Sequence, residues 1–254
     1  SVFTTGAFFV LSISAYHLLK KKEIEFFKKS FNIATVFGAI SILLVVLIGH
    51  QQAQHMIRTQ PMKMASAEAL WVGEDPASFS ILTIVDQEKL EDIVSLPRIP
   101  YVLSILAYNA PTGRVAGILD LQEEYSLKYG PGNYIPDINV AYWSFRIMVG
   151  AGMLMLLLCL YLVIKLFQKR PSSQLRFLGI FPFAIALPYL ANSFGWILTE
   201  MGRQPWLVFG ILKTKDGVSP NVTAGMVWTS LILFTLVYAL LMFADVYLLL
   251  KYAK

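Results

Sequence analysis

The sequence predicts an all-α membrane protein with five transmembrane helices and one long external loop. Hydrophobic residues make up 56% of the 254 residues and charged residues only 15%, whereas soluble domains average about 25% charged residues. A helix needs about 20 predominantly apolar residues to cross a bilayer. Five segments reach or approach that length: 2–19, 31–49, 139–167, 177–200 and 223–250.

The charge distribution orients these spans. The net charge is +5, but the basic residues lie beside apolar runs, which is a membrane pattern and does not indicate nucleic-acid binding. The clusters at 20–29, 169–176 and 251–254 all fall on one side if the five spans alternate in direction. Because basic loops stay in the cytoplasm, segments 50–138 and 201–222 are expected outside, in a multi-pass protein surrounded by membrane lipid.

The chain therefore divides into three parts. Residues 1–49 form two transmembrane helices, the first with a shortened start, 50–138 form the external loop, and 139–254 form three more transmembrane helices. The loop holds 11 acidic and 6 basic residues, and apolar periodicity near 87–95 and 115–128 predicts surface helices. Long structured loops tend to carry function.

Two further features concern the chain as a whole. Cys159 lies within an apolar run, so we expect a small buried hydrophobic residue and no disulfide framework. The sequence starts at Ser1 without a methionine, and we expect the later part of a longer protein or a subunit that needs a partner.

The most informative motif is Glu-Met-Gly-Arg-Gln-Pro-Trp at 200–206, at the end of the fourth span. On a continuous helix Trp196, Glu200 and Arg203 share one face, at positions i, i+4 and i+7. An indole, a carboxylate and a guanidinium on one face suit a flat, charged, buried ligand. The alternative is an interfacial anchor, with Glu200 paired to Arg203 and the aromatic ring at the headgroup level.

A second motif, Tyr-Trp-Ser-Phe-Arg-Ile-Met at 142–148, places Arg146 about two turns inside the third span. A charge in hydrocarbon is costly and normally faces a partner or a polar cavity, although a long arginine can also reach the outer interface. Met148 is a thioether that can bind haem iron or simply fill a gap in the core. Gly150 and Gly152 leave room beside it for a broad ring.

A third motif lies in the loop at 60–71, where Lys63 and Glu68 stand five residues apart in amphipathic sequence beside the membrane. An apolar dihydroxy-aromatic molecule such as a quinol needs an oily wall, a hydrogen-bond donor and a carboxylate that takes a proton. The alternative is a solvated surface helix.

Together the three motifs resemble subunit I of the cytochrome bd-type quinol oxidases. That subunit has roughly nine spans, and this chain resembles its C-terminal part, from the fifth transmembrane helix through a short quinol loop to the last helix. The resemblance implies a bacterial or archaeal cell membrane and a second oxidase subunit as partner. It also implies the missing N-terminal helices of subunit I as a partner, in the same or a separate chain, because two haem-ligating histidines and the acids of the family's early helices have no counterpart here.

The resemblance assigns roles residue by residue. Met148 matches the methionine that ligates a low-spin haem b, and Arg146 the arginine that stabilises its reduced form. Glu200 matches the ligand of one of two high-spin haems, a haem b and a third haem of type d or b. Trp196 and Arg203 match residues that line that pair. Lys63 and Glu68 match residues of quinol oxidation.

The function implied is quinol oxidation at the outer face coupled to reduction of O2 to water, performed by an assembled complex and not by this chain alone. Two alternatives come from other classes. One is a transporter module with Arg146 and Glu200 as substrate contacts, favoured by Pro182 and Pro188 in the fourth span. The other is a haem-less structural subunit of a split-chain oxidase. The sequence does not distinguish ubiquinol from menaquinol.

Overall fold

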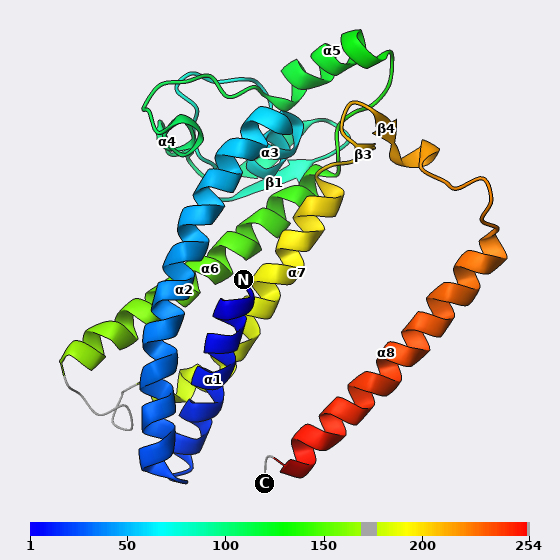
Figure 1. Cartoon of the computed structure of the whole chain (residues 1–254). Helices are drawn as coiled ribbons and strands as arrows, with labels where there is room; N and C mark the ends of the chain where they lie inside the picture. Colours follow the sequence, from blue (N-terminus) through cyan, green and yellow to red (C-terminus); the bar gives the residue numbers. More distant parts are fainter. Residues whose placement is uncertain (169–176, 253–254) are drawn as a thin grey trace.

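The computed structural model describes residues 1–168 and 177–252 and is mostly helical (Figure 1). Within these residues, five helices are long and apolar enough to cross a membrane, which confirms the predicted fold class. The expected cytoplasmic loop after Gln168, with its basic residues at 169–176, and Lys254 lie outside the described residues. The elements in chain order are α1 (Val2–Leu19), α2 (Ile24–Thr59), α3 (Pro61–Glu68), β1 (Thr83–Asp86), β2 (Glu91–Ser95), α4 (Val102–Tyr108), α5 (Ile118–Tyr129), α6 (Ile138–Phe167), η2 (Leu178–Ile185), α7 (Ala186–Met201), β3 (Trp206–Val208), β4 (Leu212–Lys213), η3 (Thr214–Asp216) and α8 (Ala224–Tyr252).

Four of the long helices, α1, α2, α6 and α7, pack into a bundle. Small residues let them approach closely, as is usual between membrane helices. A Cβ at Gly38 of α2 would already touch Ala7 of α1 at 3.4 Å and Cys159 of α6 at 3.6 Å. Cys159 is buried and unpaired, as predicted. The fourth span runs from Leu178 to Met201, within one residue of the predicted limits. It begins as the 3-10 helix η2, which contains Pro182.

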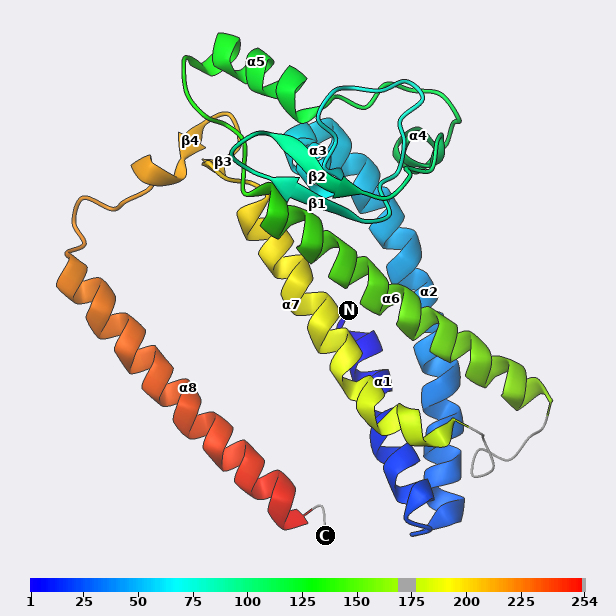
Figure 2. The same ribbon diagram turned by 180° about the vertical axis from the view of Figure 1, so that it is seen from behind.

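The fifth span, α8, stands apart from this bundle in both ribbon views (Figures 1 and 2). None of its residues is buried, although its own leucine, valine and phenylalanine side chains project on all sides of the helix. A helix that is hydrophobic all round is stable only in lipid or against other hydrophobic helices. The exposed apolar surface of α8 therefore indicates that this helix, like the four packed spans, lies in the membrane.

The segment between α2 and α6 folds into a cap over one end of the bundle (Figure 2). Helix α3 is buried from Met62 to Glu68, and α4, α5 and the hairpin β1–β2 surround it. One apolar cluster joins the cap to the bundle and to the turn after α7. Its buried members include Met62, Val85, Leu121, Tyr134, Tyr142 and Trp206.

The structure corrects two predicted boundaries. Helix α2 does not end at 49 but continues to Thr59, so the first part of the expected loop is an extension of the span. The prediction of a surface helix near 87–95 is wrong, because these residues form the turn and the second strand of the β1–β2 hairpin. The Asp86 carboxylate accepts hydrogen bonds from the backbone N–H groups of Glu88 and Lys89 and so stabilises that turn. The surface helix predicted near 115–128 is present as α5.

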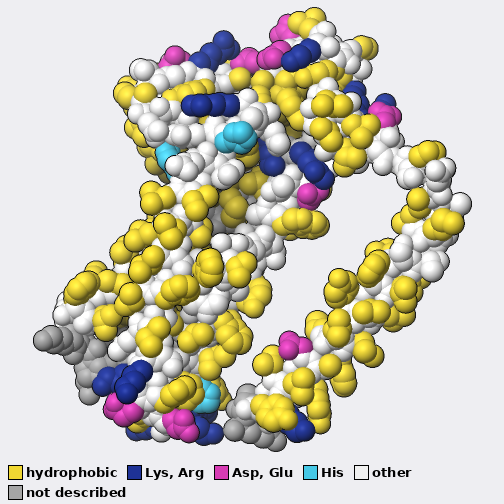
Figure 3. All heavy atoms as spheres, viewed as in Figure 1, with side chains coloured by type: hydrophobic (Ala, Val, Ile, Leu, Met, Phe, Trp, Pro, Cys, Tyr) yellow, Lys and Arg dark blue, Asp and Glu magenta, His cyan; other side chains and the backbone are white. Residues whose placement is uncertain are grey.

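Charged side chains gather at the two ends of the molecule, and hydrophobic side chains cover the helices between them (Figure 3). One charged end is the cap, and the other is the turn between α1 and α2, where Lys20, Lys21 and Lys22 are exposed. An apolar belt between two charged ends is the surface expected of a protein that crosses a bilayer.

Candidate functional site

Helix α3 brings the three sequence motifs together. Pro61 occupies its first turn and Ala69 ends it in the left-handed conformation (φ 47°), so the helix is short and fixed at both ends. It packs against α2, α5 and α6. Lys63 and Glu68 are five residues apart, or about 140° around the helix axis, and they therefore face different partners.

Glu68 faces α6 and forms an ion pair with Arg146, 78 residues away. Arg146 Nη2 donates to Glu68 Oε2 at 2.7 Å and Nη1 donates to Oε1 at 3.2 Å. The side chains are only 1% and 13% exposed. Two N–H···O bonds to one carboxylate are the strongest geometry available to this pair. Arg146 therefore has the partner that was expected of a buried charge, and that partner belongs to α3 in the cap.

Loop and aromatic groups complete the surroundings of the pair. Arg146 Nη2 also donates to the backbone carbonyl of Ser80 at 2.7 Å. Its guanidinium lies over the rings of Tyr142, Phe79 and Phe145, at 4.5, 4.8 and 5.4 Å from their centres. Sequence reasoning missed Ser80, for which no motif gave a signal, whereas Tyr142 lay within the motif that carried Arg146.

Burial raises the pKa of the Glu68 carboxyl above its ordinary value. Arg146 opposes this shift by its charge and its hydrogen bonds, and the nearby backbone of Ser80 opposes it as well. A carboxyl group in such surroundings is closer to its protonated state near neutral pH than an exposed one, so it is better suited to accept a proton and pass it on.

Lys63 faces the other way, toward the end of α7. Its ammonium donates to the carbonyl of Thr199 at 3.2 Å and to Gln60 Oε1 at 3.4 Å. Burial lowers the pKa of Lys63, and the nearby Arg203 adds to the effect while Glu200 opposes it. The glycine of the 200–206 motif makes this contact possible, because a Cβ at Gly202 would lie 2.9 Å from Lys63 Cγ.

The 200–206 motif forms a turn and does not continue the helix. Helix α7 ends at Met201, so Arg203 does not share a helical face with Trp196 as predicted. Arg203 folds back and forms an ion pair with Glu200, with both side chains about one third exposed, which confirms the pairing but not the helical spacing. Trp196, one turn earlier, is 67% exposed.

A cavity of about 230 Å³ lies between α3 and this turn. Lys63 and Arg203 supply its positive charges, and Gln60 and Gln204 supply amide groups. Tyr134 and Trp206, whose rings stack at 5.6 Å, form an aromatic wall. The cavity thus combines an aromatic wall with hydrogen-bond donors, as a flat polar ring requires. Glu68 does not line it.

Met148 faces α7, away from Arg146, as their separation on α6 predicts. It packs with Phe145 against Ala67, Ala141 and Leu198, and a Cβ at Gly195 of α7 would lie 3.0 Å from its sulfur. A Cβ at Gly150 or Gly152 would meet no atom of the described residues within 4 Å. Gly152 lies four residues after Met148 and so on the same side of α6, where it leaves space for a large group, whereas Gly150 opens the opposite side.

Comparisons with known proteins agree on one family. The family described as cytochrome bd terminal oxidase subunit I matches residues 1–254. The chain is similar to subunit 1 of a cytochrome bd ubiquinol oxidase from Bacillus subtilis (strain 168), with 47% identity over 93% of this chain and 51% of that protein. It is also similar to subunit 1 of the cytochrome bd-II ubiquinol oxidase of Escherichia coli (strain K12), with 30% identity over 99% of this chain and 60% of that protein.

A solved structure shows the same fold. The bd oxidase from Geobacillus thermodenitrificans matches with a TM-score of 0.80 and 28% identity, over 98% of this chain and 54% of that one. The chain therefore spans about half the length of the relatives that it matches.

Proposed function

Because the chain belongs to the cytochrome bd terminal oxidase subunit I family, we propose that it forms part of a membrane quinol oxidase. In the assembled complex, quinol is oxidised at the outer face and O2 is reduced to water. The observation that carries this proposal is helix α3, which presents Lys63 to a cavity and holds the buried carboxyl of Glu68 on its other side.

The cavity beside Lys63 is the proposed place of the quinol head group. Tyr134 and Trp206 supply aromatic surface for the ring, and the Lys63 ammonium donates a hydrogen bond to a ring oxygen. Glu68 accepts a proton that the quinol releases. Since Glu68 does not line the cavity, this transfer passes through at least one water molecule between the two faces of α3.

Two positions of the chain, Met148 and Glu200, are proposed to ligate haem iron. Met148 is proposed as a ligand of the low-spin haem b because it is a thioether in the same helix as Gly152, where a Cβ would meet no atom of the described part of the chain within 4 Å, and Arg146 lies two residues before it. Glu200 fits a high-spin haem b or the third haem, of type d or b, with Arg203 and Trp196 beside it. When bound, the haems supply the electron transfer to O2. A carboxylate ligand lowers the potential of its iron, whereas a nearby cation raises it.

The proposed topology places residues 50–138, which are the end of α2 and the cap, on the outer side of the bacterial membrane. The basic turn between α1 and α2 then lies in the cytoplasm, and the exposed surface of α8 contacts lipid, a second oxidase subunit or the N-terminal helices of subunit I. We propose the division into 1–49, 50–138 and 139–254 as bundle helices, quinol-binding region and haem-bearing helices.

The experiment that tests this function compares Lys63→Met with the unchanged chain in the assembled oxidase. Loss of the ammonium is expected to raise KM for quinol about tenfold, which corresponds to one hydrogen bond of about 1.4 kcal/mol. Oxygen consumption with an artificial low-potential donor checks that the complex is intact. Equal losses with both donors would show misfolding and would leave the cavity without a role.

A reduced-minus-oxidised visible spectrum separates this proposal from the two other classes. An assembled oxidase shows haem bands, and those of the low-spin haem depend on Met148. A transporter module shows no haem bands, and a haem-less structural subunit shows none that change when Met148 or Glu200 is replaced.

A further inference from the structure

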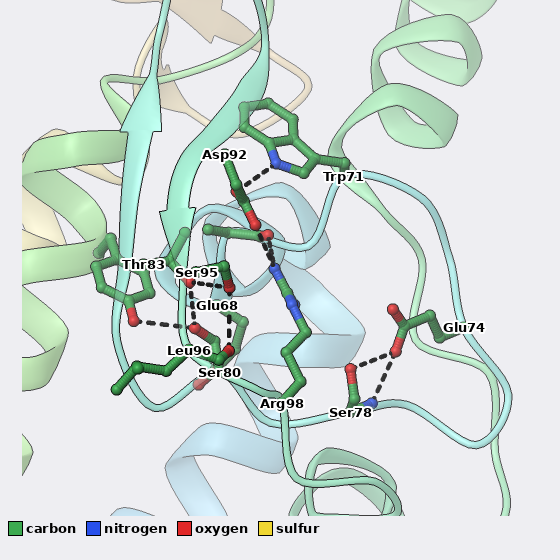
Figure 4. A network of polar contacts seen from close by, with 12 residues as sticks. Glu68, Trp71, Glu74, Ser78, Ser80, Thr83, Asp92, Ser95, Leu96 and Arg98 are labelled. Carbon is green, nitrogen blue, oxygen red and sulfur yellow. Dashed lines mark hydrogen bonds and ion pairs between the residues drawn. The ribbon is translucent and has the colours of Figure 1, made fainter.

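A row of hydroxyl groups connects the buried ion pair with the surface of the cap. Ser80 Oγ lies 2.9 Å from the Tyr142 hydroxyl and 2.8 Å from Thr83 Oγ1, and Thr83 Oγ1 lies 3.0 Å from Ser95 Oγ. Tyr142, Ser80 and Thr83 are fully buried, whereas Ser95 is exposed. The row therefore begins in the interior and ends at an exposed residue; Figure 4 shows Ser80, Thr83 and Ser95 from close by.

The hairpin register explains why these groups meet. Thr83 of β1 and Ser95 of β2 are directly paired across the two strands, so their side chains point to the same face. The hairpin is held over α3 by Asp92, which accepts a hydrogen bond from Trp71 at 2.7 Å and pairs with Arg98, while Arg98 donates to the carbonyl of Ala69. Figure 4 shows this frame beside the hydroxyl row.

The hydrogen atoms of the row have one consistent orientation. Ser95 Oγ donates to the carbonyl of Leu96 at 3.2 Å, and a carbonyl can only accept. Each hydroxyl has one hydrogen to give, so Thr83 donates to Ser95, Ser80 donates to Thr83, and Tyr142 donates to Ser80. All of these hydrogens point from the interior toward the surface, which is the orientation that outward proton transfer requires.

The inner end of the row adjoins Glu68. The backbone of Ser80 lies close enough to the Glu68 carboxyl to lower its pKa, and the backbone carbonyl of Ser80 accepts a hydrogen bond from Arg146. Ser80 thus contacts both members of the ion pair through its backbone and begins the row with its side chain. Its Oγ accepts one hydrogen bond from Tyr142 and keeps a second lone pair for another donor.

We propose that Ser80, Thr83 and Ser95 form a proton-release path from Glu68 to the outer surface, with Tyr142 as the positioning residue that orients it. This proposal rests on the proposed function, in which Glu68 receives a quinol proton. The hydroxyl groups do not line the cavity proposed for the quinol. They remove the proton so that Glu68 is ready for the next turnover.

The proton balance closes without electron transfer. The acid proton of Glu68 passes through a bridging water molecule to Ser80 Oγ, the Ser80 hydroxyl proton to Thr83 Oγ1, and the Thr83 proton to Ser95 Oγ. The Ser95 hydroxyl turns away from the Leu96 carbonyl and gives its proton to external water. Each O–H bond that breaks is matched by one that forms. Rotation of the three hydroxyls about their C–O bonds then restores the original orientation.

The test uses two substitutions at Thr83 in the assembled oxidase. Thr83→Val keeps the shape of the side chain but removes the hydroxyl, whereas Thr83→Ser keeps the hydroxyl. With a short-tailed benzoquinol as donor, the valine variant is expected to oxidise quinol about tenfold more slowly, in line with the loss of one assisted proton transfer. Its rate ratio between H2O and D2O is expected to increase, and the serine variant to stay within about twofold of the unchanged chain.

The matched control is Thr35→Val, because Thr35 is an equally buried threonine on α2 that bonds only its own helix, at the carbonyl of Phe31. The visible haem spectrum of every variant checks assembly. Glu68→Gln is measured in parallel.

The outcomes separate the path from the proposed function. A slow Glu68→Gln variant together with a Thr83→Val variant of unchanged rate and isotope ratio would refute the path while the quinol function stands. Unchanged rates in both would refute the role of Glu68 itself. Equal slowing in the valine and serine variants, with an unchanged isotope ratio, would show that Thr83 is needed only for packing and would also overturn the path.

Discussion

Replacing Glu68 with glutamine removes the negative charge of the buried ion pair while keeping the shape of the side chain. Removing one member of a buried pair costs about 3–5 kcal/mol, because the other charge is left uncompensated. Here Arg146 keeps the Ser80 carbonyl and three aromatic rings, and the glutamine oxygen still accepts one N–H, a bond to a charged group worth about 1.5–3 kcal/mol. The expected net loss of stability is about 2 kcal/mol.

The assay is the rate of thermal inactivation of the solubilised oxidase, followed by the loss of its haem absorbance. If the whole loss appears in the unfolding barrier, E68Q inactivates about 30-fold faster than the unchanged chain. The double variant E68Q/R146M is expected to be more stable than E68Q alone, since replacing both partners of a buried pair costs less than removing one. Quinol oxidation by E68Q is expected to fall about 100-fold or more, because the proton acceptor is gone.

The reasoning is refuted if E68Q inactivates at the rate of the unchanged chain, because the pair would then contribute nothing to the fold. It is equally refuted if the double variant is less stable than E68Q by the full cost of a second independent loss, since additive effects mean that the two side chains do not interact.

Four further predictions address the remaining sites. Met148→Leu is expected to remove the low-spin haem signal with little change in assembly, and an unchanged spectrum would exclude this ligand. Glu200→Ala is expected to lose a high-spin haem, and full oxygen consumption would count against that assignment. Gly202→Ala is expected to raise KM for quinol several-fold because its Cβ would press on the Leu198 carbonyl at 2.7 Å and on the α3 lysine at 2.9 Å. Gly49→Ala, where a Cβ meets nothing within 4 Å, should leave KM unchanged. Glu68 must be deprotonated to accept a proton, and its pKa is raised. Quinol oxidation is therefore expected above that raised pKa and should be lost as the pH falls through it, at a higher pH than for an exposed carboxyl group. A pH–rate profile whose acid limb lies at an ordinary carboxyl pKa would contradict this.

The sequence was sufficient for the membrane-spanning architecture. Whether a segment such as 139–167 crosses a bilayer depends on its own length and apolar composition, and its backbone hydrogen bonds are satisfied within the helix. Nothing distant is needed, so all five spans are present in the structure, although α2 is longer than predicted. The same holds for α5, whose apolar periodicity is visible in twelve consecutive residues.

Local pattern was misleading where two arrangements are close in energy. Short apolar pieces with polar neighbours, such as 87–95, suit a helix or a strand, and the pairing with β1 decides between them. The turn after α7 is similar. The helical spacing of Glu200 and Arg203 was sound only if the helix continued, and it ends at Met201.

The sequence by itself determined which side chains are chemically unusual: a lysine and a glutamate beside the membrane, and an arginine and a methionine within it. Only the tertiary structure decided that Glu68 pairs with Arg146, that Lys63 faces the other side of α3, and that three hydroxyls lead from Ser80 to the surface. The ion pair joins residues 78 positions apart. Such a contact depends on how α3 packs against α6 and beneath the hairpin, and that packing is the summed effect of many residues spread along the chain.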